Sequence, residues 1–199
     1  MNLEKLKERF EENGFEASVF ETKEEASAYL NREVDQTTVG FGGSVGLDEM
    51  GLRESLKEHN TVYYHGFYEN AEEGMNLAKD ADVYILTANA VAENTGEILN
   101  IDGTGNRVSS TLYGHRKVYM VVGKNKISPD FDSALYRLRN VVAPHNARRL
   151  SRKTPCAVKA DKCYNCNSPE RICNALVVHY KKMYSEDMEV ILINENLGY

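Results

Sequence analysis

The four cysteines of the chain all lie in one short polar segment, residues 154–174. Cys156, Cys163, Cys166 and Cys173 have the spacing C-x6-C-x2-C-x6-C. The central C-x2-C pair is a common two-ligand arrangement, because it brings both sulfurs to one side of a tight turn. The spacing predicts either an iron–sulfur cluster, such as a 4Fe-4S cluster, or a tetrahedral zinc site, and it does not separate the two. Four reduced, unliganded cysteines are one alternative, and a disulfide pair formed by oxidation is another.

A second candidate site is the glycine-rich stretch from Thr37 to Gly51, which starts with β-branched residues and ends with apolar residues at helical spacing. This pattern predicts a buried strand, a turn and the start of a helix. Glycine permits positive φ and lets a ligand approach main-chain N–H groups, and a helix start adds unpaired donors. We therefore predict an anion-binding loop at Gly42, Gly43, Ser44 and Gly46. A tight turn without a ligand is the alternative, since the stretch matches neither GxGxxG nor GxxxxGK[ST].

A polar loop follows the apolar strand predicted at residues 82–87. Ligands of open α/β sheets bind beyond the carboxyl ends of strands, so we expect this loop to face the glycine-rich stretch. Glu93 and Glu97 are candidate catalytic carboxylates, as a general base or a nucleophile. The residues between them are candidate ligand-binding residues: Asn94, Thr95 and Gly96. The alternative is a polar loop that only leads into a hairpin.

A third polar group lies in the turn at residues 102–107. Asp102, Asn106 and Arg107 are candidate ligand-binding residues, because an arginine on a glycine-flanked loop can hold a carboxylate or phosphate in bidentate fashion. An internal ion pair between Arg107 and Asp102 is the alternative.

The composition is that of an ordinary soluble globular protein. The 199 residues carry a formal net charge of −6, with 42% hydrophobic and 27% charged residues. We expect a single domain over residues 1–199 that includes the cysteine segment. The chain has no long basic stripe and no apolar run of membrane-spanning length, so neither nucleic acid nor a membrane is an expected partner. The first residues predict an amphipathic helix and not a signal peptide, and we expect a cytoplasmic, reducing location.

Strand-like and helix-like segments alternate along the chain. This alternation predicts an α/β fold with a mainly parallel sheet covered by helices on both faces. The last two predicted strands are hydrophobic, and one of them is expected at an edge that pairs across a homodimer. The predicted helices are residues 3–13, 22–30, 70–81 and 130–140, and the predicted strands are residues 15–20, 61–65, 82–87, 96–102, 117–123, 175–180 and 188–194.

Several of these segments together resemble the LUD-domain family, which is named for lactate utilisation. They are residues 39–51, 82–97, 100–108 and 190–199, and the resemblance is to short stand-alone members with a cysteine segment. It implies a three-layer α/β sandwich like that of ribose-5-phosphate isomerase, glucosamine-6-phosphate deaminase and the CoA transferases. In that superfamily the glycine loop binds phosphate or an acyl-carrying ligand.

The resemblance also implies a role in lactate, or 2-hydroxy acid, utilisation. On this interpretation the protein is an accessory or redox-associated component, with one four-cysteine centre, a small anionic ligand or substrate, and redox partner subunits. Two alternatives stay open. One is an enzyme of the sugar-phosphate isomerase or acyl/CoA-transfer type that uses Glu93 or Glu97. The other is a non-catalytic binding or regulatory module with a structural zinc.

Overall fold

The computed structural model describes residues 2–199, and its centre is a six-stranded sheet in which every neighbouring pair of strands is parallel. The near-continuous apolar runs of the central strands fit a sheet that is buried on both faces. In spatial order the strands are β1 (Glu16–Phe20), β10 (Asp187–Ile193), β7 (Lys117–Gly123), β4 (Val83–Thr87), β2 (Thr38–Phe41) and β3 (Thr61–Tyr64).

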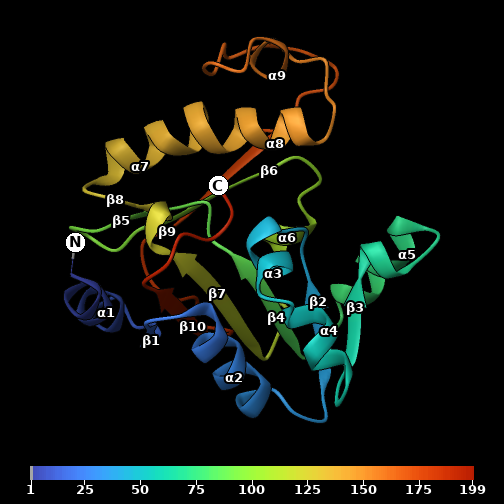
Figure 1. The fold of residues 1–199 in the computed structure, drawn as a ribbon, viewed down its shortest axis with the longest axis vertical. Coiled ribbons are helices and arrows are strands. Elements are labelled where there is room, and N and C mark those ends of the chain that lie inside the picture. Colours follow the sequence, from blue (N-terminus) through green and yellow to red (C-terminus); the bar gives the residue numbers. More distant parts are fainter. Residues whose placement is uncertain (1) are drawn as a thin grey trace.

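Helices cover both faces of this sheet (Figure 1). On one face, α2 (Lys23–Glu33), α3 (Val45–Glu49) and α4 (Leu52–Lys57) bury their apolar side chains against β2, β4 and β7. On the other face lie α1 (Leu3–Glu12) and α5 (Ala71–Ala78). The predicted three-layer α/β sandwich with a mainly parallel sheet is therefore confirmed.

A second, four-stranded sheet shares the face covered by α1. Its strands are β8 (Ile127–Ser128), β5 (Ala90–Ala92), β6 (Ile98–Asp102) and β9 (Ala175–His179), in that spatial order. Val91 and Ile98 point toward the main sheet, whereas Ala90, Ala92 and Leu99 point away from it and pack on the helix that follows β8. This alternation explains how one short sheet separates two apolar clusters.

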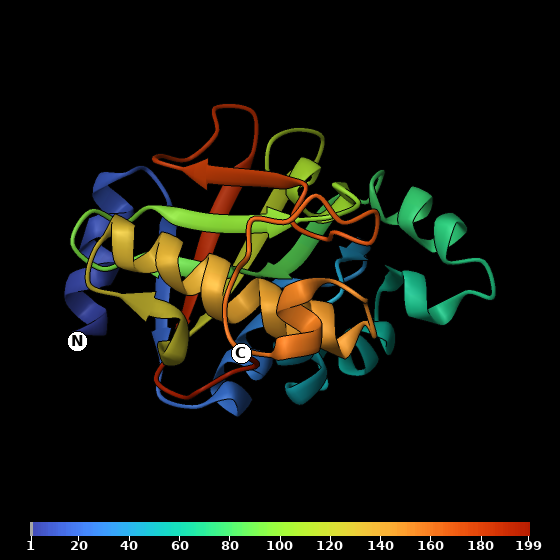
Figure 2. The same cartoon turned by 90° about the horizontal axis from the view of Figure 1, so that it is seen from above.

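The helix that covers the smaller sheet is longer than the predicted residues 130–140. It runs from α7 (Phe131–Arg137) through a π-helical turn (Leu138–Val142) into α8 (Ala143–Arg149), and Figure 2 shows it crossing the smaller sheet. Pro144 lacks an N–H group and normally ends a helix, which is why the sequence predicts an earlier end. The wider π turn just before the proline lets the chain continue in the same direction.

The two C-terminal strands have different positions. β10 lies between β1 and β7, so it is not an edge, whereas β9 is an edge of the smaller sheet. An edge pairing across a homodimer therefore stays a prediction for β9 alone. Within residues 2–199, the helices are all too short or too polar to cross a membrane.

Candidate functional site

A cavity of about 580 Å³ lies where the parallel strands end. The loop after β2 contributes Ser44, the segment after β4 contributes Asn89, and the turn after β7 contributes Lys126. The carboxyl ends of parallel strands meet at the same edge of a sheet, which explains how residues so far apart in sequence surround one space. The cavity is within the size range of small-molecule sites.

The glycine loop is held in place from its carbonyl side. Arg53 donates to the carbonyl oxygen of Gly42 at 3.0 Å and pairs with Asp48. The Ser44 hydroxyl caps α3 and lies 2.7 Å from the hydroxyl of Thr87. In the described part of the chain, the main-chain N–H groups of Gly43 and Ser44 have no acceptor. Two donors of the loop therefore remain available to a ligand.

Close approach explains the glycine at position 42. A Cβ atom there would lie 2.8 Å from both Cγ and Cδ of Arg107, and Gly42 has no positive φ. Positive φ, which glycine permits, is therefore not the reason for glycine at this position. Glycine is required because the Arg107 side chain packs directly against the main chain.

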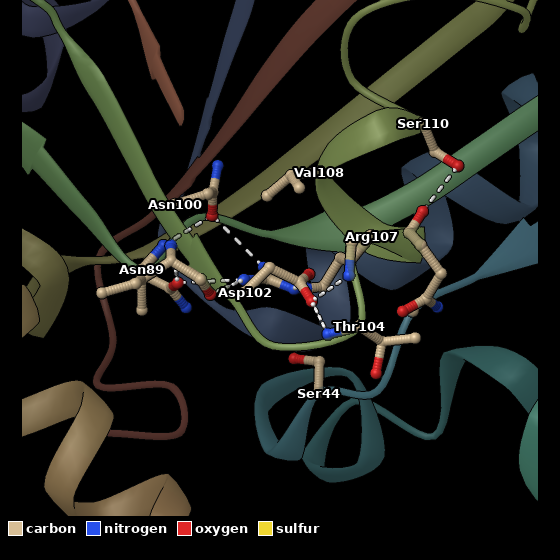
Figure 3. Close-up of polar contacts among 12 residues, drawn as sticks. Ser44, Asn89, Asn100, Asp102, Thr104, Arg107, Val108 and Ser110 are labelled. Atoms are coloured by element: carbon tan, nitrogen blue, oxygen red, sulfur yellow. Dashed lines mark hydrogen bonds and ion pairs between the residues drawn. The ribbon is translucent and has the colours of Figure 1, made fainter. Parts of the chain in front are cut away.

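Arg107 lies at the start of α6 (Asn106–Ser109) and is 8% exposed. One terminal nitrogen of its guanidinium donates to the carbonyl oxygen of Thr87 at 2.9 Å and to Oδ1 of Asn100 at 3.2 Å. The other donates to Oδ1 of Asn89 at 2.9 Å and to the carbonyl oxygen of Ile101 at 3.0 Å (Figure 3). The guanidinium therefore ties three segments together at the floor of the cavity.

Asp102 completes this cluster. Its Oδ2 lies 3.5 Å from Nε of Arg107, and its Oδ1 accepts from the N–H groups of Thr104 and Gly105 at 3.0 and 2.8 Å. Burial lowers the pKa of Arg107, and the charge of Asp102 opposes that change. All the donors of Arg107 are used internally, so the ion-pair alternative is what the structure shows. Arg107 contributes fixed positive charge to the cavity and no free fork for a ligand.

Lys126 is the buried cation of the cavity that has no partner. It follows β7 in the short 3₁₀ turn Lys124–Lys126 and is 3% exposed. Among residues 2–199, no hydrogen-bond acceptor or carboxylate contacts its ammonium group. Burial, followed by the charges of Arg107 and Arg137, lowers its pKa to about 7.

His65 lies next to Gly43 of the glycine loop, whereas Arg107 packs against Gly42. It begins the 3₁₀ turn His65–Phe67 after β3, and its Cε1 would be 3.2 Å from a Cβ at Gly43. Burial, followed by the charges of Arg53 and Arg149, lowers its pKa, so the imidazole is neutral at pH 7. The cavity is thus lined by a neutral imidazole as well as by cations.

Two arginines and the C-terminal tyrosine lie at the exposed rim of the cavity. Arg149 donates to the hydroxyl of Tyr199 at 3.0 Å, and both residues contact Oδ1 of Asn146. Arg152 is exposed and lines the same space. The cavity therefore has a strongly positive lining in a protein whose formal net charge is −6.

The loop at residues 93–97 lies elsewhere. Asn13 donates to the carbonyl oxygen of Thr95 at 2.9 Å, and Glu93 accepts from the main chain of Asn2 at 3.2 Å, so this loop packs against α1. Glu97 accepts from the Thr95 hydroxyl. None of Glu93, Asn94, Thr95, Gly96 and Glu97 lines the cavity.

The expectation that this loop faces the glycine loop is therefore wrong. The chain crosses from β4 into β5 before it turns, and this carries the loop one strand away from the carboxyl edge of the main sheet. The catalytic role predicted for Glu93 and Glu97 stays a prediction.

The cysteine segment forms one wall of the cavity. Cys156, Cys163, Cys166 and Cys173 are half-buried free thiols. Arg171, which lines the cavity, donates to Sγ of Cys173 at 3.2 Å and to the carbonyl oxygen of Cys166 at 2.9 Å.

The thiols do not converge as a site with four cysteine ligands would require. Within the part of the chain that the structure describes, no three His, Cys, Asp or Glu side chains are grouped to hold a metal ion. The residues as arranged therefore do not fit a four-cysteine centre, and we derive no step through one. The iron–sulfur or zinc centre stays a prediction from the spacing.

Sequence reasoning identified six of the 27 residues that line the cavity. Of the predicted ligand-binding residues, the cavity is lined by Gly43, Ser44, Gly46, Asp102, Asn106 and Arg107, and Gly42 lies directly behind Arg107. Among the lining residues that it missed are His65, Asn89, Lys126, Arg149, Arg152 and Tyr199. The sequence signal for Lys126 is its position just after a central strand, but Lys124 has the same position. The two lysines differ in burial, which only the folded structure shows: Lys126 is buried and Lys124 is half-buried.

Comparisons with known proteins agree with this architecture. The family model described as LUD domain matches residues 3–193. Among solved structures, a DUF162 family protein from Deinococcus radiodurans is similar over 96% of each chain, with a TM-score of 0.53 and 12% sequence identity. At that identity, the likeness concerns the fold alone. Among curated proteins, no sequence matches the chain.

Proposed function

The chain belongs to the LUD-domain family, and from this premise we propose that it binds a small anionic metabolite in the cavity at the carboxyl ends of β2, β4 and β7. The ligand class is a carboxylate or a phosphate. A 2-hydroxy acid, which the family resemblance implies, is a carboxylate and belongs to this class.

The single observation that carries the proposal is the unpartnered Lys126. A buried ammonium without a counter-charge is costly, and proteins normally pair such a group with a carboxylate or leave it neutral. Here Glu49 acts on it only through longer-range attraction. A bound anion supplies the missing counter-charge, and the free N–H groups of Gly43 and Ser44 offer further donors.

Arg107 supports this function without contacting the ligand through a free donor. Its charge is held at the floor of the cavity by four hydrogen bonds and by Asp102. Because its charge is fixed before binding, the Arg107 side chain does not have to be ordered when the anion arrives. The rim residues Arg149 and Arg152 add attraction at the entrance.

We further propose that this ligand site serves an accessory or redox-associated component of 2-hydroxy acid utilisation. The support for the redox part is the cysteine spacing and the family resemblance. The isomerase and acyl-transfer alternatives relied on Glu93 or Glu97, and neither side chain reaches the cavity.

Binding is tested by thermal unfolding with inorganic phosphate and with L-lactate. A ligand at 100 times its dissociation constant stabilises the native state by about 2.7 kcal/mol, which corresponds to roughly 5–10 °C for a domain of this size. We expect that shift in the wild type and in the matched control Lys124→Met, which changes a lysine outside the cavity. In Lys126→Met the shift should be largely lost. Equal shifts in all three proteins, or no shift with either anion, would contradict the proposal.

A further inference from the structure

We propose that Lys126 is a nucleophile, and that its side-chain amine forms an imine with an aldehyde or ketone that carries a carboxylate or phosphate group. This inference rests on the anion-binding function proposed above and specifies the chemistry of the same site. It adds a carbonyl group to the ligand and a covalent role to the lysine.

The first support is the position of the side chain. Lys126 is 3% exposed, yet it lines the cavity, and in residues 2–199 its amine is engaged by no acceptor. A lysine that is tied into an ion pair is not free to attack a carbonyl carbon, whereas this one is. Its neighbour Lys124 is half-buried and does not line the cavity.

The second support is the local electrostatics. Arg107 from α6 and Arg137 from α7 act on Lys126 as like charges, and Glu49 at the end of α3 is the opposing carboxylate. An exposed lysine is neutral in only about 0.04% of molecules at pH 7. Burial beside two other cations makes the neutral, nucleophilic amine far more abundant, which is a known way to activate a catalytic lysine.

A third support is that the cavity contains both an arginine and a lysine, which differ in their chemistry. Arg107 is already a permanent cation there, with each of its donors used internally. If the cavity needed only more positive charge, a second arginine would supply it at every pH. A lysine in this place adds a property that arginine lacks, namely a neutral amine near pH 7.

The reaction balances without a redox partner. The lone pair of Nζ attacks the carbonyl carbon and forms a C–N bond as the carbonyl π bond breaks, and one proton passes from the nitrogen to the oxygen, giving a neutral carbinolamine. The nitrogen then loses its second proton, the C–O bond breaks, and the oxygen leaves as water, so that one amine and one carbonyl give one imine and one water. Protonation of the imine by solvent restores a positive charge at this position, where the anionic group of the ligand offsets it.

The experiment traps the imine with sodium borohydride, which supplies the hydride that converts it to a stable secondary amine. The probes are glyceraldehyde 3-phosphate and succinic semialdehyde, and peptide mass spectrometry locates the adduct. We expect the modification at Lys126 to exceed that at Lys124 by at least about tenfold, reflecting the difference in neutral amine. Uncharged glyceraldehyde should react at Lys126 much less than its phosphate does.

Matched analogues separate this inference from the binding function. Glycerol 3-phosphate and 4-hydroxybutyrate replace the carbonyl by a hydroxyl, and both should bind without forming an adduct. Lys126→Arg keeps the charge, so it should still bind glycerol 3-phosphate and give no adduct, whereas Lys124→Arg should react like the wild type.

Each result has a defined meaning. If the analogues bind but no adduct forms at Lys126, or if the adducts are spread evenly over surface lysines, the covalent role is wrong and anion binding stands. If neither the analogues nor the carbonyl probes bind, both proposals fail.

Discussion

The Arg107 cluster and the cysteine segment form two walls of the same cavity, but they are held in different ways. Arg107 is buried and makes four hydrogen bonds and an ion pair to the end of β4, to the residues just after it and to β6. Between Ser151 and Asn174, by contrast, Thr154 and Ala157 are the buried residues. One wall is part of the core of the domain, and the other is a surface segment placed over it.

This difference indicates which wall determines the chemistry. A buried network keeps its geometry whether or not a ligand is present, because each polar group would be costly to separate from its partner. The cysteine segment is fixed by a few partly exposed contacts: the N–H of Cys163 donates to Oδ1 of Asn140 at 3.1 Å, and Asn174 donates to the carbonyl oxygens of Asp102 and Gly103 at 2.9 and 3.0 Å. The site therefore has a rigid charged floor and a more loosely held side wall.

The largest expected loss of stability follows from a change in the Arg107 cluster. Arg107→Met removes the donors to Thr87, Asn89, Asn100 and Ile101 and leaves Asp102 buried without its counter-charge. We expect the free energy of unfolding to fall by about 3–5 kcal/mol, as for other broken buried ion pairs. Urea unfolding measures this change.

The matched variant on the other wall is Arg171→Met. Its guanidinium is half-buried and bonds within the cysteine segment, so we expect a loss of about 1 kcal/mol or less. Similar losses for the two variants would show that the walls are equally part of the core, and the comparison above would be wrong.

The same contrast explains how far the sequence could be interpreted. The apolar runs of β4, β7 and β10 and the glycine-rich loop predict a parallel sheet with a site at its carboxyl edge, because these patterns are local. The short strand β5 is not predicted, since three small residues carry no periodic signal. Without this strand, the sequence wrongly predicts that Glu93 and Glu97 lie at the ligand site. The distinction between Lys124 and Lys126 depends on how the turn packs, which no local pattern encodes.

Replacing Lys126 should have a smaller effect on the free energy of unfolding than replacing Arg107, and this effect should be stabilising. Because burial lowers its pKa from 10.5 to about 7, the unfolded chain binds more protons than the native protein between these two values. The penalty is therefore complete below pH 7, shrinks as the pH rises, and vanishes above 10.5. Lys126→Met should raise the free energy of unfolding by about 1–3 kcal/mol at pH 7.

The control for this prediction is Lys124→Met, whose side chain is half-buried and outside the cavity. Urea unfolding from pH 6 to pH 10 should show the gain of Lys126→Met decreasing toward high pH, and no such trend for Lys124→Met. A gain that is constant with pH would mean that the pKa of Lys126 is the same in the native and the unfolded protein, and the amine would then not be enriched in its neutral form near pH 7.

The smallest expected effect on stability is on the cysteine wall. Replacing Cys156, Cys163, Cys166 and Cys173 together by serine should change the free energy of unfolding of the metal-free domain by about 1 kcal/mol or less, because none of the four is fully buried. Phosphate binding should persist, since Lys126 and the glycine loop are unchanged. Urea unfolding and the phosphate-induced thermal shift measure both quantities.

The same variant tests the centre predicted from the spacing. If the cysteines hold a cluster, as their spacing predicts, protein purified without oxygen should contain iron and sulfide in cluster proportions and absorb visible light, and the four-serine variant should be colourless. Stoichiometric zinc in place of iron would identify the site as structural, because four cysteines leave no open position on the metal. Wild-type protein with neither metal would show that the thiols act separately, as the structure arranges them, and that hydrogen bonds such as those of Arg171, Asn174 and Asn140 hold the side wall of the cavity.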